Sequence, residues 1–477
     1  MAALTNPKHR YDCRARALDS AIKRLNGWLE DDTLLFWAYV LFLIGCAVAI
    51  LHGIAHYLFL WIVIPLVFLR AVVLEASRSP LELSFGAKLS LSRVLKGGRT
   101  VSVIVSAACL YLSFGAKLSL SRFLRIGTTV SVIWSAAGLY LLMLILSSAL
   151  PQPTVSMKKL TEVSFNSFEI LAFLFVTAIL VVSSKGFLRT CLTVVSIAAA
   201  AIALVAIIVF VATRPFDYLF YFRLGHAAWP KEVGPNVASL AINSGIFLVA
   251  SIAIFLEDTR SLWHRIPLAA SALTLMSALV LTQSRSVCLA ALAGIAATIH
   301  WSSRSIRRAA VAVPAVLILA LILITTVPGV SEIILWRGDS RRLEIWSHYI
   351  NTSWDQPWLG SGIMSNIFET MDGAVIPHPH NLILSAQERG GVLATGAMIV
   401  MLLGGLYYSA RYAKLTGQRA PLGIMVTLVV AGIFDYQIRI LSFPDWQTLF
   451  FWLPVGICIG AEHFVRARRN GESGAIA

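Results

Sequence analysis

The chain has 477 residues, of which 58% are hydrophobic and 13% charged, and its formal net charge is +15 at pH 7. This composition lies far outside the range of soluble domains and excludes a single water-exposed globular core. Apolar runs of roughly 18 to 22 residues recur along the chain, each long enough to cross a bilayer as a helix. The sequence therefore predicts an all-α, polytopic integral membrane protein.

The apolar runs predict about twelve transmembrane helices. They cover residues 34–51, 57–76, 129–150, 166–184, 189–213, 237–256, 266–282, 286–301, 309–328, 391–410, 421–436 and 446–463. The predicted organisation is a basic tail at 1–33, helices within 34–328, a large and partly helical loop at 329–390, helices within 391–463, and a second tail at 464–477.

The positions of lysine and arginine predict the orientation of these helices. Basic residues such as Arg304, Arg411 and Arg466 lie in the short loops and the tail on one side of the predicted spans. The positive-inside rule makes that side cytoplasmic, together with both termini. Segments 214–236 and 329–390 then face outward. Because this rule accounts for the basic balance, we do not expect nucleic acid as a partner.

Residues 83–111 and 112–140 form a near-perfect tandem repeat, since both copies open with Leu-Ser-Phe-Gly-Ala-Lys-Leu-Ser-Leu-Ser-Arg. Two copies are too few for a solenoid. We interpret the repeat as a duplication that lengthens a membrane-proximal segment. Whether residues 77–128 contain a further span remains open.

The predicted loop at 329–390 is much longer than the other connections, and long ordered loops are usually functional. It contains Trp336, Trp346, Trp354 and Trp358. Tryptophan prefers the interface between membrane and water, and aromatic belting alone would account for some of these residues. We expect a small helical subdomain at the membrane face, and we expect the chemistry of the protein there.

The end of this loop carries the sharpest local motif, Pro377-His378-Pro379-His380-Asn381. Histidine is the usual general base near neutral pH, and the prolines restrict the backbone around it. The alternative is a prolyl turn with two solvated histidines.

The two histidines also raise the question of a metal, because a His-x-His pair can offer two ligands. A zinc site normally needs a third protein ligand. Glu369, Asp372 and Glu388 could supply one, but no spacing singles out any of them. The six cysteines suggest neither a zinc site nor a disulfide framework. We expect no metal and no other cofactor.

Three arginines, Arg223, Arg285 and Arg342, lie on the same predicted side as the histidines. Arg285 sits where one predicted span ends and the next begins, a costly place for an uncompensated charge. A snorkelling side chain at a helix end is the ordinary alternative. Guanidinium groups bind phosphates bidentately and keep their charge. A phosphate-bearing lipid is therefore a natural partner, and a departing lipid diphosphate would need charge neutralisation more than protonation.

Several separated motifs resemble, in order and spacing, the O-antigen ligase superfamily, which contains lipopolysaccharide O-antigen ligases and O-antigen polymerases. The resemblance covers roughly residues 200 to 410. The motifs that carry it are Arg223 with Gly234-Pro235-Asn236, Thr282-Gln283-Ser284-Arg285-Ser286, Arg342-Leu343-Glu344-Ile345-Trp346, Pro357-Trp358-Leu359-Gly360-Ser361-Gly362, His378-Pro379-His380-Asn381 and Ala386-Gln387-Glu388-Arg389-Gly390-Gly391.

The resemblance implies an inverting, metal-independent glycosyltransferase of the bacterial inner membrane, with its active site on the periplasmic face. Such an enzyme takes glycan from an undecaprenyl diphosphate carrier, and a ligase delivers it to lipid A-core oligosaccharide. By the same resemblance His380 would deprotonate the acceptor hydroxyl, with His378 and Asn381 in supporting roles. Arg223 and Arg285 would clamp the diphosphate, and Arg342 would help to bind substrate.

Other activities remain open at this point. An O-antigen polymerase uses the same donor but extends a carrier-linked glycan, and a protein O-glycosylating ligase is a third choice. We favour the ligase, because lipid A-core is anionic and the chain is basic. From a different class, a lipid-linked oligosaccharide flippase would need its arginines deep in a central cavity, whereas these map to outer loops and helix ends. The sequence specifies neither the sugar nor the oligomeric state.

Overall fold

The computed structural model describes fourteen stretches of the chain, and every structural statement below refers to them. They are residues 33–47, 52–67, 131–149, 156–183, 186–213, 223–224, 237–257, 262–300, 342–362, 368–369, 375–376, 378–435, 443–445 and 447–470. The predicted span at 309–328 and most of the tandem repeat at 83–140 lie outside these residues.

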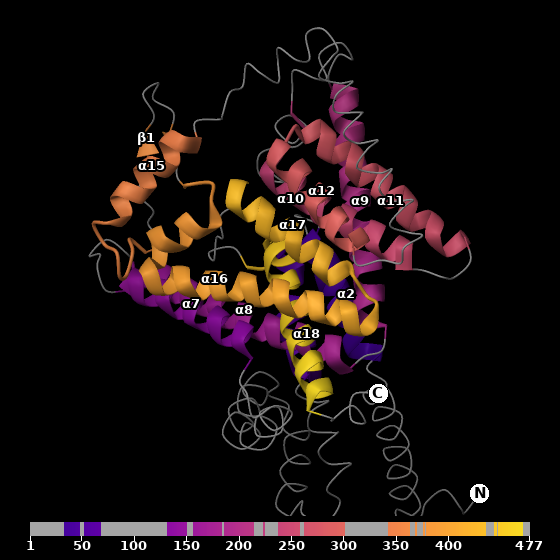
Figure 1. Ribbon diagram of the computed structural model, residues 1–477, viewed down its shortest axis with the longest axis horizontal. Coiled ribbons are helices and arrows are strands. Elements are labelled where there is room, and N and C mark those ends of the chain that lie inside the picture. The colour runs from indigo at the N-terminus through magenta and orange to yellow at the C-terminus, as the bar shows by residue number, and fades with distance from the viewer. Residues whose placement is uncertain are drawn as a thin grey trace, which may run out of the picture. The chain divides into compact units, whose positions relative to one another are not determined.

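The described residues are almost entirely helical (Figure 1). In chain order the helices are α2 (Thr33–Ala47), α3 (His52–Leu58) with the π-helical turn η3 (Phe59–Val63), α7 (Val132–Ala149), α8 (Met157–Ser183), α9 (Phe187–Thr213), α10 (Val237–Glu257), α11 (Leu262–Thr282), α12 (Arg285–His300), α15 (Arg342–Ser353), α16 (Leu382–Thr416), α17 (Ala420–Asp435) and, after the π-helical turn η5 (Thr448–Trp452), α18 (Leu453–Arg469). Two short strands, β1 (Phe368–Glu369) and β2 (Val375–Ile376), form one antiparallel pair.

Seven of the described helices are long and apolar enough to cross a membrane, and three shorter apolar helices accompany them. A described helix occurs at eleven of the twelve predicted positions, and the twelfth is the undescribed run 309–328. The prediction of an all-α, polytopic membrane protein is therefore confirmed. The count of twelve spans stays a prediction.

The contacts divide the chain into two units, residues 1–42 with 57–129 and residues 43–56 with 130–477. Every candidate site residue belongs to the second unit, which is described by itself from here on.

Within this unit, α12 packs closely along α17 because small residues line the contact. A Cβ atom on Gly294 would lie 2.1 Å from Thr427 Oγ1, and one on Gly423 would lie 2.3 Å from Thr298 Oγ1. Rising numbers in α12 thus meet falling numbers in α17, so the two helices run antiparallel. Small residues allow such close helix contacts in membranes.

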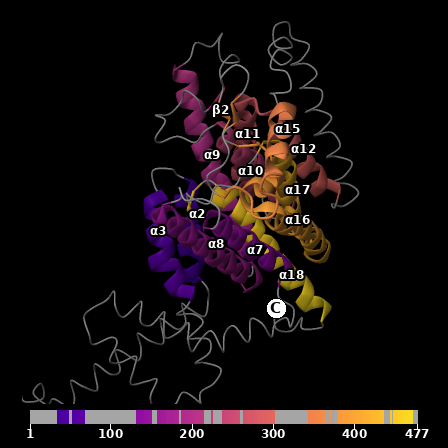
Figure 2. The same cartoon turned by 90° about the vertical axis from the view of Figure 1, so that its left-hand side faces the viewer.

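A second group of helices surrounds α16, which packs along α7, α17 and α18. Figure 1 shows α16 running beside α7, and Figure 2 shows α7 next to α8 in the turned view. α18 packs against α8 as well. One end of α16 therefore lies near the loop helix α15, and its other end lies near the start of α7 and the end of α18.

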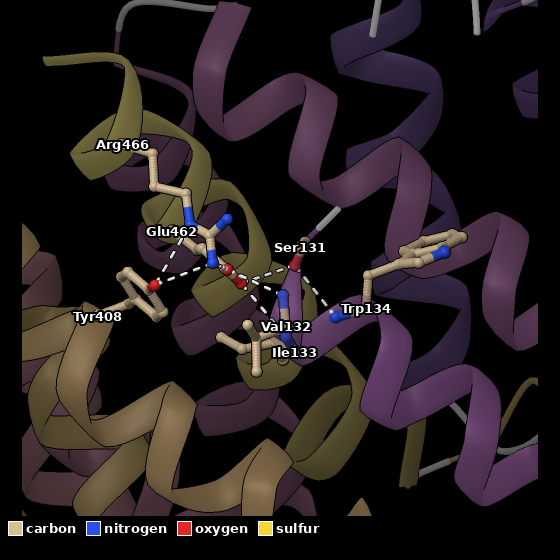
Figure 3. Close-up of polar contacts among 7 residues, drawn as sticks. All are labelled: Ser131, Val132, Ile133, Trp134, Tyr408, Glu462 and Arg466. Atoms are coloured by element: carbon tan, nitrogen blue, oxygen red, sulfur yellow. Dashed lines mark hydrogen bonds and ion pairs between the residues drawn. The ribbon is translucent and has the colours of Figure 1, made fainter. Parts of the chain in front are cut away.

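The carboxylate of Glu462 in α18 caps the start of α7, and its side chain is fully buried (Figure 3). Its partners are Ser131 Oγ at 2.6 Å, Val132 N at 2.9 Å, Ile133 N at 3.3 Å and Arg466 Nη2 at 2.6 Å. The first N–H groups of a helix have no partner within the helix, and a carboxylate there also interacts well with the helix dipole. Arg466 in turn donates to the hydroxyl of Tyr408 in α16. This network joins three helices.

Candidate functional site

The helix that was predicted to begin near Gly391 begins nine residues earlier, at Leu382. Asn381 caps it, because its Oδ1 accepts the N–H groups of Ile383 at 2.9 Å and Leu384 at 3.0 Å. Gly391 has φ 69° and ψ −167°, which interrupts the helix. The predicted boundary therefore marks a break inside α16 rather than its start.

The break is completed by the segment Pro357–Gly362, which supplies hydrogen bonds that a regular helix would make within itself. The backbone contacts are Val392 N to Pro357 O at 2.8 Å, Ser361 N to Glu388 O at 2.6 Å and Gly362 N to Arg389 O at 3.1 Å. Gly391 adopts a conformation that is essentially restricted to glycine, and a Cβ atom there would lie 2.1 Å from Trp358 O. Two motifs that are separate in the sequence thus form one structural unit.

The side chains of Glu388 and Arg389, placed in a loop by the sequence interpretation, lie inside α16 and are only 3% and 8% exposed. From its residue type, Glu388 was expected to be at most a third metal ligand, and it also belongs to one of the motifs that carry the resemblance. The signal that was available is Asn381, because asparagine is among the preferred residues for capping a helix start.

His378 and His380 lie side by side, with ring centroids 4.0 Å apart and ring planes inclined by 53°. Both are half-buried. His380 has φ +51°, in the left-handed region that residues other than glycine rarely adopt. Such strained residues gather at functional sites, which supports a functional role for His380.

Helix α15 holds the backbone on both sides of His378. Trp346 Nε1 donates to Pro379 O at 2.9 Å, and the hydroxyl of Tyr349 donates to Ile376 O at 3.1 Å. Burial raises the pKa of Tyr349 above its usual range, so the hydroxyl remains a donor at physiological pH. Within the predicted loop, residues 342–353 thus form a short helix that donates hydrogen bonds to the histidine motif and to β2, the strand before it.

Arg342, the first residue of α15, precedes Trp346 by four residues and Tyr349 by seven. Residues with this spacing share one face of a helix. Arg342 is half-buried, and it belongs to the face of α15 that contacts the histidine motif.

Arg223 is anchored to the end of α11, although 59 residues separate it from its partner. Its Nε donates to Thr282 O at 2.9 Å, and Leu224 N donates to Leu281 O at 3.0 Å. The structure therefore brings two of the motifs together, the Arg223 motif and the one that begins at Thr282.

Arg285 is the first residue of α12, and its side chain is exposed. It follows Gln283, which has φ +53° and is, with His380, one of two described non-glycine residues with positive φ. The start of a helix favours anions because of its exposed N–H groups and its dipole. A guanidinium at this position gives a local arrangement suited to phosphate.

The packing of α12 against α17 places Arg285 and His380 at the same end of the helices. Gly294 faces Thr427. At a rise of 1.5 Å per residue, Arg285 lies about 13 Å from this crossing along α12, and Ile433 lies about 9 Å from it in the same direction along α17. Asn381 Nδ2 donates to Ile433 O at 2.9 Å. The histidine motif therefore lies near Ile433, at the end of α17 that is on the same side of the crossing as Arg285.

Metal ligands are not gathered in the described part of the chain, where no group of three or more His, Cys, Asp or Glu side chains comes together. Asp372 lies outside the described residues. A reaction without a metal remains a prediction.

Comparison with known proteins supports the assignment made from the motifs. Residues 269–395 match the family model described as O-Antigen ligase. No curated protein matches the chain. The matched segment runs from α11 into α16 and contains Arg285, Arg342, His378, His380 and Asn381, whereas Arg223 lies outside it and contacts it through Thr282. Members of the matched family are glycosyltransferase-like ligases or polymerases. The match covers about a quarter of this membrane protein, and in that segment the chain is similar to the O-antigen ligase/polymerase superfamily.

Proposed function

We propose that the protein is an O-antigen ligase that moves glycan from undecaprenyl diphosphate to lipid A-core oligosaccharide. The observation that carries this proposal is the position of His380. It lies in a strained backbone conformation, in the family-matched segment, at the same end of the helices as Arg285. A base and an anion-binding arginine are the two groups that this reaction needs.

In the proposed reaction His380 accepts the proton of the acceptor hydroxyl as the oxygen attacks the anomeric carbon of the donor sugar. The bond from that carbon to the diphosphate oxygen breaks, and its electron pair leaves with undecaprenyl diphosphate. A single displacement of this kind inverts the anomeric configuration. His378, whose ring lies beside that of His380, and Asn381 act in support by fixing the motif.

The arginines have the role of stabilising the departing diphosphate. Arg285 offers a guanidinium at the start of α12, and Arg223 is hydrogen-bonded to the last residue of α11, Thr282, three residues before Arg285. Fixed positive charges directed at a leaving group lower the barrier because they need no reorganisation during the reaction. Arg342 is proposed to contact the substrate from α15. All three would work without a metal.

This function requires the histidine end of the helices to face the periplasm and both termini to lie in the cytoplasm. The donor lipid and the acceptor core would then meet at the outer surface of the inner membrane. The exposed basic side chains Arg411, Lys414, Arg468 and Arg469, at the far ends of α16 and α18, support this orientation through the positive-inside rule.

The experiment that tests the proposal is reconstitution of the purified protein in proteoliposomes with undecaprenyl-diphosphate-linked glycan and lipid A-core. We expect core-linked product in amounts that a chelator does not reduce. A lengthening, carrier-linked ladder would instead select the polymerase. Movement of the donor across the bilayer without transfer would select the flippase, and activity lost with chelator but restored by added metal would contradict the metal-free reaction.

Replacing Arg285 by Gln should lower kcat/KM for the lipid-linked donor about 10- to 100-fold, because hydrogen bonds to charged groups contribute about 1.5–3 kcal/mol each. Arg285→Lys should recover part of this loss, since it restores the charge without the bidentate fork. Arg411→Gln, a change of the same type at an exposed position in α16, is the matched control. Equal losses in both Gln variants would argue against a diphosphate clamp.

A further inference from the structure

Two hydrogen bonds to main-chain oxygens join helix α15 to the segment that contains the histidine motif. Trp346 and Tyr349, three residues apart on one face, reach Pro379 O at 2.9 Å and Ile376 O at 3.1 Å. These carbonyls lie on either side of His378 in the chain. The carbonyl of Pro379 belongs to the peptide group that joins Pro379 to His380. The contacts therefore act on the path of the backbone and not on either imidazole.

The backbone at His380 is strained and depends on its neighbours to keep its conformation. His380 is held at φ +51°, a conformation that a non-glycine residue keeps only where its surroundings impose it. On one side of His380, Asn381 is fixed by its cap of α16 and by its bond to Ile433 O. On the other side, the fixed point is the carbonyl of Pro379, and Trp346 is its donor.

We propose that Trp346 and Tyr349 are positioning residues that hold His380 in its left-handed conformation and so aim its ring at the acceptor. This inference rests on the proposed function of His380 as the base. Neither residue needs to touch substrate. Trp346 fixes the peptide next to His380, and Tyr349 fixes the strand β2 that leads into the motif.

The burial of the two donors supports this role. Tyr349 is 1% exposed, although it carries a hydroxyl group, and Trp346 is half-buried. A hydroxyl that is buried must be hydrogen-bonded to avoid a cost in free energy, and Tyr349 directs it at a carbonyl of the histidine segment. The next two tryptophans along the chain differ, because Trp354 and Trp358 are 73% and 70% exposed. Trp346 therefore differs from these two tryptophans in its burial and in its hydrogen bond to Pro379 O, although all three belong to the same predicted loop.

The test uses Trp346→Phe and Tyr349→Phe in the full-length protein. Tyr349→Phe removes only the hydroxyl donor, whereas Trp346→Phe removes the N–H donor together with part of the ring volume. We expect kcat for glycan transfer to fall about 10-fold or more in each variant, because a small displacement of a catalytic group is enough for such a loss. The KM for the lipid-linked donor should stay within about twofold, since Arg223 and Arg285, which are proposed to clamp its diphosphate, lie outside α15. Trp354→Phe and Tyr407→Phe, at exposed positions, are the matched controls and should match the unmodified protein.

A second readout does not depend on activity. Diethyl pyrocarbonate modifies accessible imidazoles, and peptide mass spectrometry measures its rate at His378 and His380 separately. We expect the rate at His380 to change at least about twofold in Trp346→Phe, because the loosened peptide alters the surroundings of the ring. The thermal midpoint should remain close to that of the Trp354→Phe control.

The two readouts separate the possible failures. If Trp346→Phe and Tyr349→Phe keep both kcat and the modification rate of His380, the positioning role is wrong while the proposed function stands. If kcat falls only with a lower thermal midpoint and an unaltered modification rate, α15 has a general structural role and the inference also fails. If His380→Asn retains transfer, the assignment of His380 as the base fails, and the modification rate in Trp346→Phe still reports whether α15 holds the segment.

Discussion

His380→Asn should reduce glycan transfer about 100- to 10,000-fold, the range that a general base contributes. Asparagine is the informative replacement because it tolerates the left-handed conformation better than most residues. It therefore leaves the backbone at φ +51° with little added strain while it removes the basic nitrogen. The variant should fold and bind the lipid-linked donor as the unmodified protein does. Initial rates of core-linked product in proteoliposomes measure the effect.

His378→Asn is the matched control, because it removes an imidazole whose centroid lies 4.0 Å from that of His380. We expect a smaller loss than for His380→Asn, since His378 is assigned a supporting role. His380→Ala adds a second comparison. If His380→Asn is active and His380→Ala is not, the position is needed for its backbone conformation, and the assignment of the base would be wrong. A larger loss in His378→Asn would transfer the base to His378.

The positions of the helices were predictable because apolar runs of sufficient length leave the backbone few alternatives in a membrane. The start of α16 is indicated in the sequence only by the capping residue Asn381 and not by an apolar run. Residues 386–390 are partly polar, and they form a helix because the segment Pro357–Gly362 supplies hydrogen bonds around Gly391. That segment lies about 30 residues earlier in the chain, and a local pattern contains no information about such a partner.

The candidate site residues were identified through the ordered motifs, but their arrangement was not. Nothing in the sequence indicates that Trp346 donates to Pro379 O, because a tryptophan in a loop near a membrane also fits an interfacial belt. Nor does the sequence indicate that Arg223 contacts Thr282. Both contacts depend on packing between segments that are distant in the chain. The positive φ of His380 and of Gln283 likewise follows from such contacts and not from local preference.

Glu462 lies within the predicted last span, and nothing in the sequence pointed to its role as the cap of another helix. Glu462→Ala should destabilise the protein by about 3–5 kcal/mol, the usual effect of breaking a buried ion pair by removing one partner. The loss leaves the side chain of Ser131 and the first N–H groups of α7 without their acceptor. The change also removes the carboxylate that pairs with the guanidinium of Arg466, while the hydrogen bond from Arg466 to Tyr408 remains (Figure 3).

A double-mutant cycle with Glu462→Gln and Arg466→Met tests this account, with unfolding free energies taken from denaturant titrations in mixed micelles. Arg466→Met leaves the buried carboxylate of Glu462 without its cation, and Glu462→Gln leaves the half-buried guanidinium of Arg466 without its anion. The double variant is neutral and keeps a carbonyl oxygen to cap α7. The double variant should therefore be more stable than the sum of the single effects predicts.

Activity per folded molecule should be unchanged in all variants, because the cap lies about 22 Å along α7 from Ser147, where the loop segment at Gly362 packs. Additive effects would show that the carboxylate and the guanidinium are not coupled, and a fall in kcat in the folded fraction would show that the cap reaches the site through α7.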